Sequence, residues 1–204
     1  MDGRIPDCTG VLLAGGQATR LGGVAKGLLR LSGEPIAARS LRLFGEIFDA
    51  ALVVANDPAP YAALGAPVVA DAIPGKGAPG GIHAALAAAR TGWIFAAACD
   101  MPFLSAEAIR FLWSLRGGAP AVAVHWGGRV EGLFSFWSRT CLPVVERLLR
   151  EGDPSLWRLA TEVRAAVVPE AAWRAFDPAG RVFANANAPG DLSRLGLLLP
   201  SRGG

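Results

Sequence analysis

The sequence predicts an α/β fold in which a mostly parallel sheet is covered by helices on both faces, giving three layers. Two observations lead to this prediction. Short apolar segments alternate with longer amphipathic ones along the chain, as in proteins built on a parallel sheet. One short segment, Trp93–Cys99, is apolar throughout, which is typical of a strand that is buried on both faces.

The individual elements follow from periodicity and from residues that begin or end a helix. Leu41, Phe44 and Ile47 fall on one face at helical spacing, and Ser105 is suited to cap the helix that follows it. We expect "AVAVHW" and "GLFSFW" to pair around "GGR", and two short strands and a final short helix between residues 163 and 194. The other expected elements are the strands Thr9–Ala14, Ala50–Ala55 and Pro67–Ala70 and the helices Ile36–Phe48, Gly80–Arg90, Ser105–Leu115 and "CLPVVERLLREG".

Length and composition fit one globular domain over residues 1–204. Apolar residues make up 52% and charged residues 18% of the chain, which argues against disorder. The apolar stretches are too short to cross a membrane and the N-terminus lacks a signal-peptide core, so we expect a cytoplasmic protein. A net charge of +3 without a basic run fits anionic small molecules better than nucleic acid. Three cysteines and two histidines, without a metal-binding spacing, argue against a disulfide framework or a structural zinc site.

Polar signals follow four of the expected strands. A glycine-rich loop comes after Ala14, and Asn56, Asp71 and Asp100 stand at or just after the next strands. In open parallel sheets, ligands bind outside the carboxyl ends of the strands. We therefore expect these groups to meet in one cleft.

The glycine loop, "LLAGGQATRLGGVAKGLL", suits phosphate binding. Glycines let backbone N–H groups approach phosphate oxygens closely, and Arg20 and Lys26 add positive charge. The loop fits neither G-x-G-x-x-G nor a Walker P-loop, because Lys26 is followed by Gly27 instead of Ser or Thr. The alternative interpretation is a long turn with two solvated surface cations.

Three further positions have both a chemical and a structural interpretation. Asp100 closes an apolar strand, where a lone carboxylate suits Mg²⁺ or caps a turn. Asn56 and Asp71 suit ribose or base contacts, but they are also common turn formers. Asn185 and Asn187 alternate with alanines, so both amides face one way, either toward a heteroaromatic ring or along a polar strand edge.

The glycine loop resembles L-A-G-G-x-x-x-R-x-G-x-x-K, the signature of nucleotidyltransferases of the nucleotide-sugar pyrophosphorylase type. Within that superfamily the chain is most similar to the molybdenum cofactor guanylyltransferases, whose loop carries Ala-Gly-Gly as at residues 14–16. Three more stretches carry the resemblance along most of the chain: "VVANDPAPYAALGAPVVAD", "AACDMPFLS" and "VFANANAPGDL".

This resemblance implies a Rossmann-like three-layer sandwich of the nucleotide-diphospho-sugar transferase type. It implies transfer of GMP from Mg²⁺-bound GTP to the phosphate of molybdopterin or molybdenum cofactor. The nucleotide half would span about residues 1–105 and the acceptor half about 106–204. Further candidate partners are molybdoenzyme apoproteins and cofactor-delivery proteins, with no nucleic acid and no membrane.

The site residues carried over by the resemblance fall into three groups. Lys26, Arg20 and Asp100 would be catalytic, with Asp100 also the metal ligand, and Asn185 and Asn187 would bind the acceptor. The nucleotide-binding group would be Leu13, Ala14, Gly15, Gly16, Gly22, Gly23, Lys26, Asn56 and Asp71.

Four positions depart from the family pattern. Ala25 stands where an acidic residue is usual, "APGGI" replaces G-P-L-x-G, Gly132 replaces a proline and Ala188 replaces a threonine. One alternative is a related nucleotidyltransferase that uses CTP or a sugar-phosphate acceptor. The other is a non-catalytic nucleotide-binding module that delivers the cofactor. An NAD-dependent oxidoreductase is disfavoured by the glycine spacing.

Overall fold

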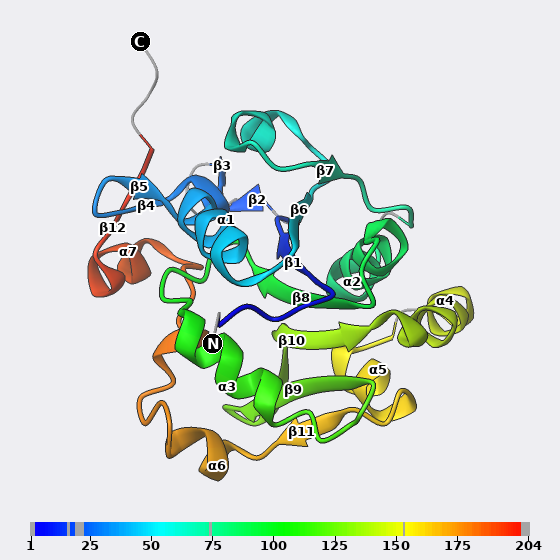
Figure 1. The fold of residues 1–204 in the computed structure, drawn as a ribbon. Coiled ribbons are helices and arrows are strands. Elements are labelled where there is room, and N and C mark those ends of the chain that lie inside the picture. The colour runs from blue at the N-terminus through cyan, green and yellow to red at the C-terminus, as the bar shows by residue number, and fades with distance from the viewer. Residues whose placement is uncertain (1–2, 16, 19–22, 74, 153, 201–204) are drawn as a thin grey trace.

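The computed structural model describes residues 3–15, 17–18, 23–73, 75–152 and 154–200 (Figure 1). A seven-stranded sheet runs through the molecule in the order β11-β9-β10-β8-β1-β6-β7. Neighbouring strands are parallel except at β10, which is antiparallel to both β8 and β9. The mostly parallel sheet predicted from the sequence is confirmed. The strands are β1 (Cys8–Leu13), β6 (Ala50–Val54), β7 (Val68–Val69), β8 (Trp93–Ala98), β9 (Ala121–Trp126), β10 (Arg129–Ser138) and β11 (Ala166–Val168).

Helices cover both faces of this sheet. Buried residues of α1, α3 and α6 belong to one hydrophobic cluster, and those of α2, α4 and α5 belong to another on the opposite side. Figure 1 shows the sheet between these two groups. The predicted three-layer arrangement is therefore present. The helices are α1 (Ile36–Ile47), α2 (Gly77–Ala88), α3 (Ala106–Ser114), α4 (Leu142–Glu151), α5 (Leu156–Glu162), α6 (Glu170–Arg174) and α7 (Pro189–Leu195).

Most predicted elements are found within a few residues of their expected ends. The N–H of Ala108 donates a hydrogen bond to the Ser105 side chain, which caps α3 as predicted. The β9–β10 pair is also confirmed. Helix α2 begins at Gly77, three residues before the predicted start, and is buried from Pro79 to Leu86.

The tail between residues 163 and 194 departs from the prediction of two strands. It contains one strand, β11, followed by α6, a 3₁₀ turn at Arg181–Phe183 and α7. The Asp177 carboxylate accepts hydrogen bonds from the N–H groups of Arg181 and Val182, both at 3.0 Å. This capping stabilises a turn at a place where the residue pattern favours a strand.

Two small sheets lie beside the large one. The glycine loop forms an antiparallel pair, β2 (Gln17–Ala18) with β3 (Val24–Ala25). The second small sheet has the order β12-β4-β5, with β4 (Arg30–Leu31), β5 (Glu34–Pro35) and β12 (Leu197–Leu198). The end of the chain is thereby paired with a segment that follows the glycine loop.

A separate apolar cluster holds these two ends of the chain together. Leu29 and Ala186 are both fully buried in it, although they lie far apart in the sequence. Its other buried members are Ile36, Leu195 and Leu197. The segment that carries Asn185 and Asn187 is therefore packed against the segment that carries Lys26.

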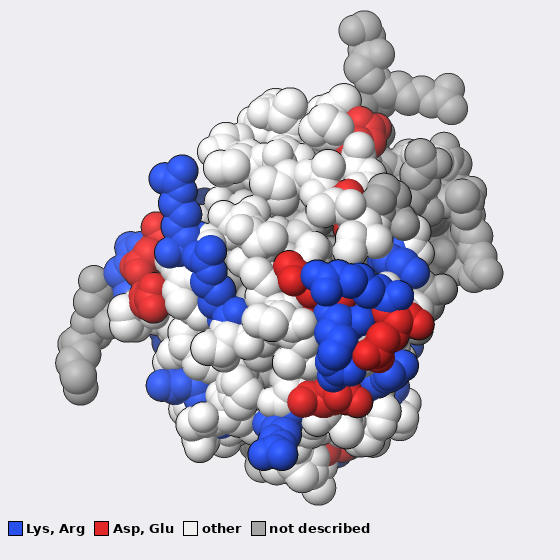
Figure 2. All heavy atoms as spheres, turned by 90° about the vertical axis from the view of Figure 1, so that its right-hand side faces the viewer, with Lys and Arg blue, Asp and Glu red and all other residues white. Residues whose placement is uncertain are grey.

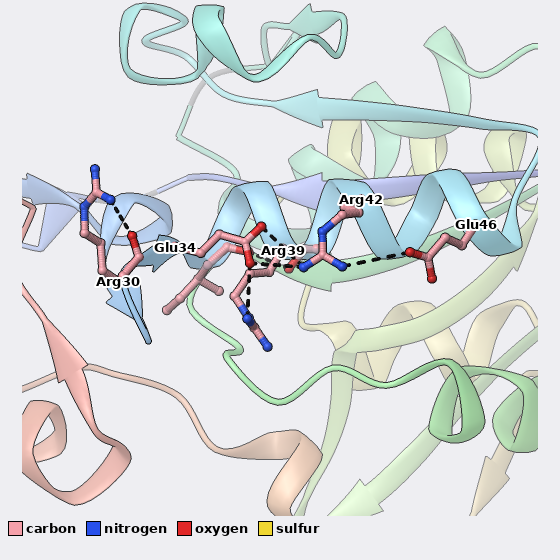
Figure 3. Close-up of polar contacts among 8 residues, drawn as sticks. Arg30, Glu34, Arg39, Arg42 and Glu46 are labelled. Carbon is pink, nitrogen blue, oxygen red and sulfur yellow. Dashed lines mark hydrogen bonds and ion pairs between the residues drawn. The ribbon is translucent and has the colours of Figure 1, made fainter.

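An ion-pair group fixes the β4–β5 hairpin to the first turns of α1. Figure 3 shows Glu34 facing Arg39 and Arg42, with Arg42 also facing Glu46. The Glu34 carboxylate lies 3.2 Å from Arg39 Nη1 and 3.0 Å from Arg42 Nη2. These pairs are partly exposed, so each contributes little to stability and mainly orients the hairpin.

A second charged network joins α4 to α5. Figure 2 shows the side of the molecule on which α4 lies, with basic and acidic side chains interleaved. Arg147 pairs with Glu151 at 2.9 Å and with Glu162 at 2.8 Å, and Arg158 pairs with Glu151 at 3.1 Å. The network aligns α5 with α4. Of the helices in the described ranges, none has the length and apolar character that a membrane span requires.

Candidate active site

Two adjoining cavities open at the carboxyl ends of the parallel strands. One has a volume of about 430 Å³ and is lined by Asn56 and Asp71, and we call it the Asp71 cavity. The other, of about 370 Å³, is lined by Lys26 and Asp100, and we call it the Asp100 cavity. Leu13, Gly15 and Leu133 line both cavities. The polar groups at the strand ends therefore meet in one two-part cleft, as the sequence predicts.

A chain of polar contacts spans the Asp100 cavity. Lys26 Nζ lies 3.0 Å from Asp100 Oδ2 and donates a second hydrogen bond, of 2.5 Å, to Asn187 Oδ1. Asn187 Nδ2 in turn donates to Asn185 Oδ1 at 2.8 Å. Four predicted site residues from three distant segments are thus brought into direct contact.

The main chain places the Lys26–Asp100 ion pair at the carboxyl ends of the parallel strands. Lys26 begins a 3₁₀ turn directly after β3, and Asp100 lies two residues after the end of β8. The N–H of Cys99 donates to the carbonyl of Leu13 at 3.1 Å, which extends the β1–β8 pairing to the residue before Asp100. The side chains of Lys26 and Asp100 are 19% and 10% exposed, so their charges are only partly screened by water.

Cys99 is not suited to act as a nucleophile in this cavity. Burial, with a smaller contribution from the neighbouring Asp100 charge, raises the pKa of its thiol to about 12. The thiol stays neutral at physiological pH, and the thiolate is the reactive form. The other polar side chains that line this cavity include Lys26, Asp100, Asn185 and Asn187.

Asp191 positions the asparagine segment and was not among the predicted site residues. Its carboxylate accepts the N–H groups of Asn187 and Ala188, both at 2.9 Å, at the start of α7. Arg194 at 2.8 Å, together with these two N–H groups, lowers the pKa of Asp191 to about 2. The contacts therefore stabilise the folded state above about pH 4 and are lost as the pH falls toward 2. An aspartate three residues after a helix N-cap was the available sequence signal.

The Asp71 cavity is built from local contacts. The N–H of Asp71 donates to Asn56 Oδ1 at 3.0 Å, and Asp71 Oδ1 accepts the N–H of Ile73 at 3.1 Å. One oxygen of Asp71 therefore forms a local turn contact, whereas the oxygen of Asn56 links two segments that lie 15 residues apart. A Cβ at Gly80 would lie 2.6 Å from Asp71 Oδ2, so the carboxylate rests against the first turn of α2. The positive end of the helix dipole favours a carboxylate there.

Residues of β10 line the Asp100 cavity and were missed by the strand-end argument. Glu131, Gly132 and Leu133 lie in this lining. Phe134 pairs with Ala97 in the antiparallel register, so the three residues before it lie at and just beyond the end of β8. A Cβ at Gly132 would meet Leu156 Cδ1 at 2.8 Å, which explains why glycine suits the close approach of α5 to this strand.

Three predicted site residues, the catalytic candidate Arg20 and the nucleotide-binding candidates Gly16 and Gly22, lie outside the described residues. Ala14 donates its N–H to the carbonyl of Val54 at 2.8 Å, so this N–H is used in the pairing of β1 with β6. Gly23 has φ of +77°, a conformation that favours glycine, at the end of the loop.

Comparisons with known proteins agree with this architecture. Residues 10–167 match the family model described as the MobA-like NTP transferase domain. The molybdenum cofactor guanylyltransferase of Vibrio cholerae is 31% identical over 196 residues, covering 95% of this chain and 94% of the relative. The enzyme of the same name from Syntrophotalea carbinolica is 32% identical over 186 residues, covering 90% and 88%.

A solved structure supports the same assignment. The molybdopterin-guanine dinucleotide biosynthesis protein A of Archaeoglobus fulgidus superposes with a TM-score of 0.72 at 28% identity, covering 91% of this chain and 95% of that one.

Proposed function

Since the chain belongs to the family of MobA-like NTP transferase domains, we propose that it transfers GMP from GTP to the terminal phosphate of molybdopterin or of its molybdenum-loaded form. The products are the guanine dinucleotide cofactor and pyrophosphate. The observation that carries this proposal is the contact of Lys26 with both Asp100 and Asn187, at 3.0 and 2.5 Å, in the Asp100 cavity. That contact unites the proposed triphosphate, metal and acceptor groups.

The Asp71 cavity suits the nucleoside. It combines apolar walls, such as Leu13 and Val54, with the amide of Asn56 and the carboxylate of Asp71. A carboxylate accepts hydrogen bonds from ribose hydroxyls or from the N–H groups of guanine. The choice of guanine rests on the names of the relatives and on the Ala-Gly-Gly loop.

The donor set fits a magnesium ion that arrives with the nucleotide. In the described part of the chain, no three His, Cys, Asp or Glu side chains are grouped as a metal cage. Mg²⁺ is commonly held by one or two carboxylates, by waters and by substrate phosphates. Asp100 supplies such a carboxylate, and bound Mg²⁺ would neutralise charge on the phosphates. Lys26 adjoins Asp100 and supplies a second positive charge for the same phosphates.

The transfer needs positioning and charge neutralisation more than proton transfer. An oxygen of the acceptor phosphate attacks the α-phosphorus of GTP in line, and the bond from that phosphorus to the β-phosphate oxygen breaks. The acceptor phosphate is already anionic at neutral pH, so no strong general base is required. Asn185 and Asn187 present amides toward the acceptor, and Lys26 stabilises the negative charge on the oxygens.

A nucleotide panel with purified protein and molybdopterin tests the reaction. Pyrophosphate release is measured with GTP, CTP, ATP and UTP, each with Mg²⁺. We expect release with GTP, and none without the acceptor. A preference for CTP would reject the guanylyl assignment. GTP binding by calorimetry without any pyrophosphate release would favour the non-catalytic delivery module.

A further inference from the structure

Glu131 is a charged residue of the Asp100 cavity that the proposed mechanism does not use. It lies on β10 and lines the cavity together with Asn185 and Asn187. Its side chain is 16% exposed. A carboxylate withdrawn from water to this extent needs partners that offer hydrogen bonds or positive charge. The contacts of its two oxygens therefore indicate what the residue can bind.

The two oxygens of Glu131 differ in their contacts. Oε1 accepts a hydrogen bond from Arg129 Nε at 2.7 Å. Oε2 has no hydrogen-bond partner among the described residues, and it is not one of the fully buried atoms that lack a partner. The contact with Arg129 thus orients the carboxylate and leaves one oxygen to accept from a molecule in the cavity.

A β-bulge in β10 turns Glu131 toward the face on which the asparagine segment packs. Glu131 pairs with Val124 of β9, which belongs to the hydrophobic cluster on the α1 side of the sheet, and directly opposed residues share a face. Phe134 also belongs to that cluster, although residues three apart on a regular strand point to opposite faces. The register shift that follows Glu131 accounts for this. Phe183, just before the asparagines, belongs to the same cluster.

The charges of the cavity favour one orientation of the proposed acceptor. Lys26 is paired with Asp100, and no ion pair joins it to Glu131 in this part of the structure. The acceptor's anionic phosphate is attracted to Lys26 and repelled by a carboxylate. The pyrimidine ring of its pterin is uncharged and carries N–H donors at N3 and at the 2-amino group, which a carboxylate accepts. The phosphate is therefore favoured near Lys26 and the pyrimidine edge near Glu131.

We propose that Glu131 is an acceptor-binding residue, and that its Oε2 accepts a hydrogen bond from the 2-amino-4-oxopyrimidine edge of the pterin. The inference rests on the proposed function for the identity of the acceptor. It gives Glu131 a part in specificity, because a ring with a carbonyl oxygen in place of the 2-amino group would set two acceptors against each other.

Free pterin and lumazine test this contact without phosphate or nucleotide. In lumazine a carbonyl oxygen replaces the 2-amino group of pterin, and both Kd values are measured by fluorescence titration. We expect the unmodified protein to bind pterin at least about tenfold more tightly than lumazine. In Glu131→Gln the Kd of pterin should rise about 10- to 100-fold, whereas that of lumazine should change less than about threefold, because the glutamine amide donates to the carbonyl oxygen.

Glu162→Gln is the matched control. It neutralises another carboxylate that is paired with an arginine, at 2.8 Å from Arg147 Nη2, on a helix position that does not line the Asp100 cavity. It should leave both Kd values unchanged. A Glu131→Gln protein that keeps the preference for pterin, or an unmodified protein that has none, would overturn the inference.

Kinetics of pyrophosphate release separate this inference from the proposed function. With molybdopterin as acceptor, Glu131→Gln should raise the KM of the acceptor about 10- to 100-fold and leave the Kd of GTP within about threefold. Since guanine carries a similar 2-amino-oxo edge, a rise in the Kd of GTP with an unchanged acceptor KM would assign Glu131 to the nucleotide and refute the inference.

The two proposals can also fail independently of each other. If the unmodified protein releases no pyrophosphate but shows a preference for pterin that depends on Glu131, the proposed function fails and the pterin contact stands. Pyrophosphate release with the same acceptor KM in Glu131→Gln and in the unmodified protein would retain the function and refute the contact.

Discussion

The two cavities of the cleft are assembled from contacts of very different range. In the Asp71 cavity, Asp71 is bonded to Asn56, 15 residues away, and to Ile73, two residues away. In the Asp100 cavity, Lys26 contacts Asp100 and Asn187, 74 and 161 residues away. The first cavity is shaped by strand ends and the turns that follow them. The second exists only after three distant segments have been packed together.

This difference shows which contacts hold the side chains of each cavity in position. The Asp71 carboxylate is held by backbone groups of its own loop and by the start of α2, so its position depends on local structure. The position of Asn187 depends on the apolar cluster around Leu29 and Ala186 and on the bonds to Asp191. Substitutions in the two cavities should therefore have separable effects on binding and on rate.

The largest expected effect comes from removing the charge at the centre of the Asp100 cavity. Asp100→Asn keeps the size of the side chain and an oxygen that can accept from Lys26, but it removes the carboxylate proposed to bind Mg²⁺. By analogy with the loss of one well-placed electrostatic group, kcat should fall about 10²- to 10³-fold. Steady-state pyrophosphate release at saturating GTP and acceptor measures this.

A metal-free binding measurement completes the Asp100 experiment. The Kd of GTP in the presence of a chelator should stay within about threefold of the unmodified value, because the proposed nucleoside contacts lie in the Asp71 cavity. Turnover close to that of the unmodified protein would show that the metal is held elsewhere.

An intermediate effect is expected in the Asp71 cavity. Asp71→Asn keeps the acceptor for the Ile73 N–H but replaces the second oxygen by an amide, which cannot accept a hydrogen bond from the nucleoside. The loss of a hydrogen bond to a charged acceptor corresponds to about a 10- to 100-fold rise in KM for GTP. Since we propose that the reacting phosphates bind in the Asp100 cavity, kcat should stay nearly constant. A fall in kcat with unchanged KM would reverse the roles given to the two cavities.

The range of the contacts also explains what could be predicted from the sequence. Asn56, Asp71 and Asp100 are brought to one edge because they follow parallel strands, and that rule needs only the strand pattern. The lining by Glu131 and Leu133 could not follow from it, because β10 runs antiparallel and enters the cleft by its register with β8. The Lys26–Asn187 contact depends on the return of the chain end beside β4, which periodicity does not encode.

The resemblance to nucleotidyltransferases predicted a relation between the glycine loop and the asparagine segment that hydrophobic periodicity could not predict. It grouped Asn185 and Asn187 with the glycine loop, and the structure places their amides in contact with Lys26 through Asn187. The matching stretch includes Asp191 but gave it no site role, and its carboxylate holds the main chain of that motif by accepting the N–H groups of Asn187 and Ala188. Residues that act through the backbone leave a weaker sequence signal than residues that act through side chains.

The smallest expected effect tests the local stability of this asparagine segment. Ala188 is the N-cap of α7, with φ of −138° and ψ of 160°, and its methyl group cannot accept a hydrogen bond. Ala188→Thr would supply an oxygen to the N–H of Gly190 or Asp191 and should raise the free energy of unfolding by about 0.5–1 kcal/mol. For a chain of this size that is a rise in Tm of about 1–4 °C, measurable by calorimetry.

Ala188→Val separates capping from side-chain shape in this last experiment. Valine has nearly the outline of threonine but no hydroxyl, so it should not raise Tm. An equal rise in both variants would mean that packing, and not the missing cap, limits stability at this position. Because Asp191 already accepts the N–H groups of Asn187 and Ala188, the threonine cap should leave Asn187 in place and kcat within about twofold. The value of kcat would then depend strongly on the charge of Asp100 and only weakly on the stability of the segment that carries Asn185 and Asn187.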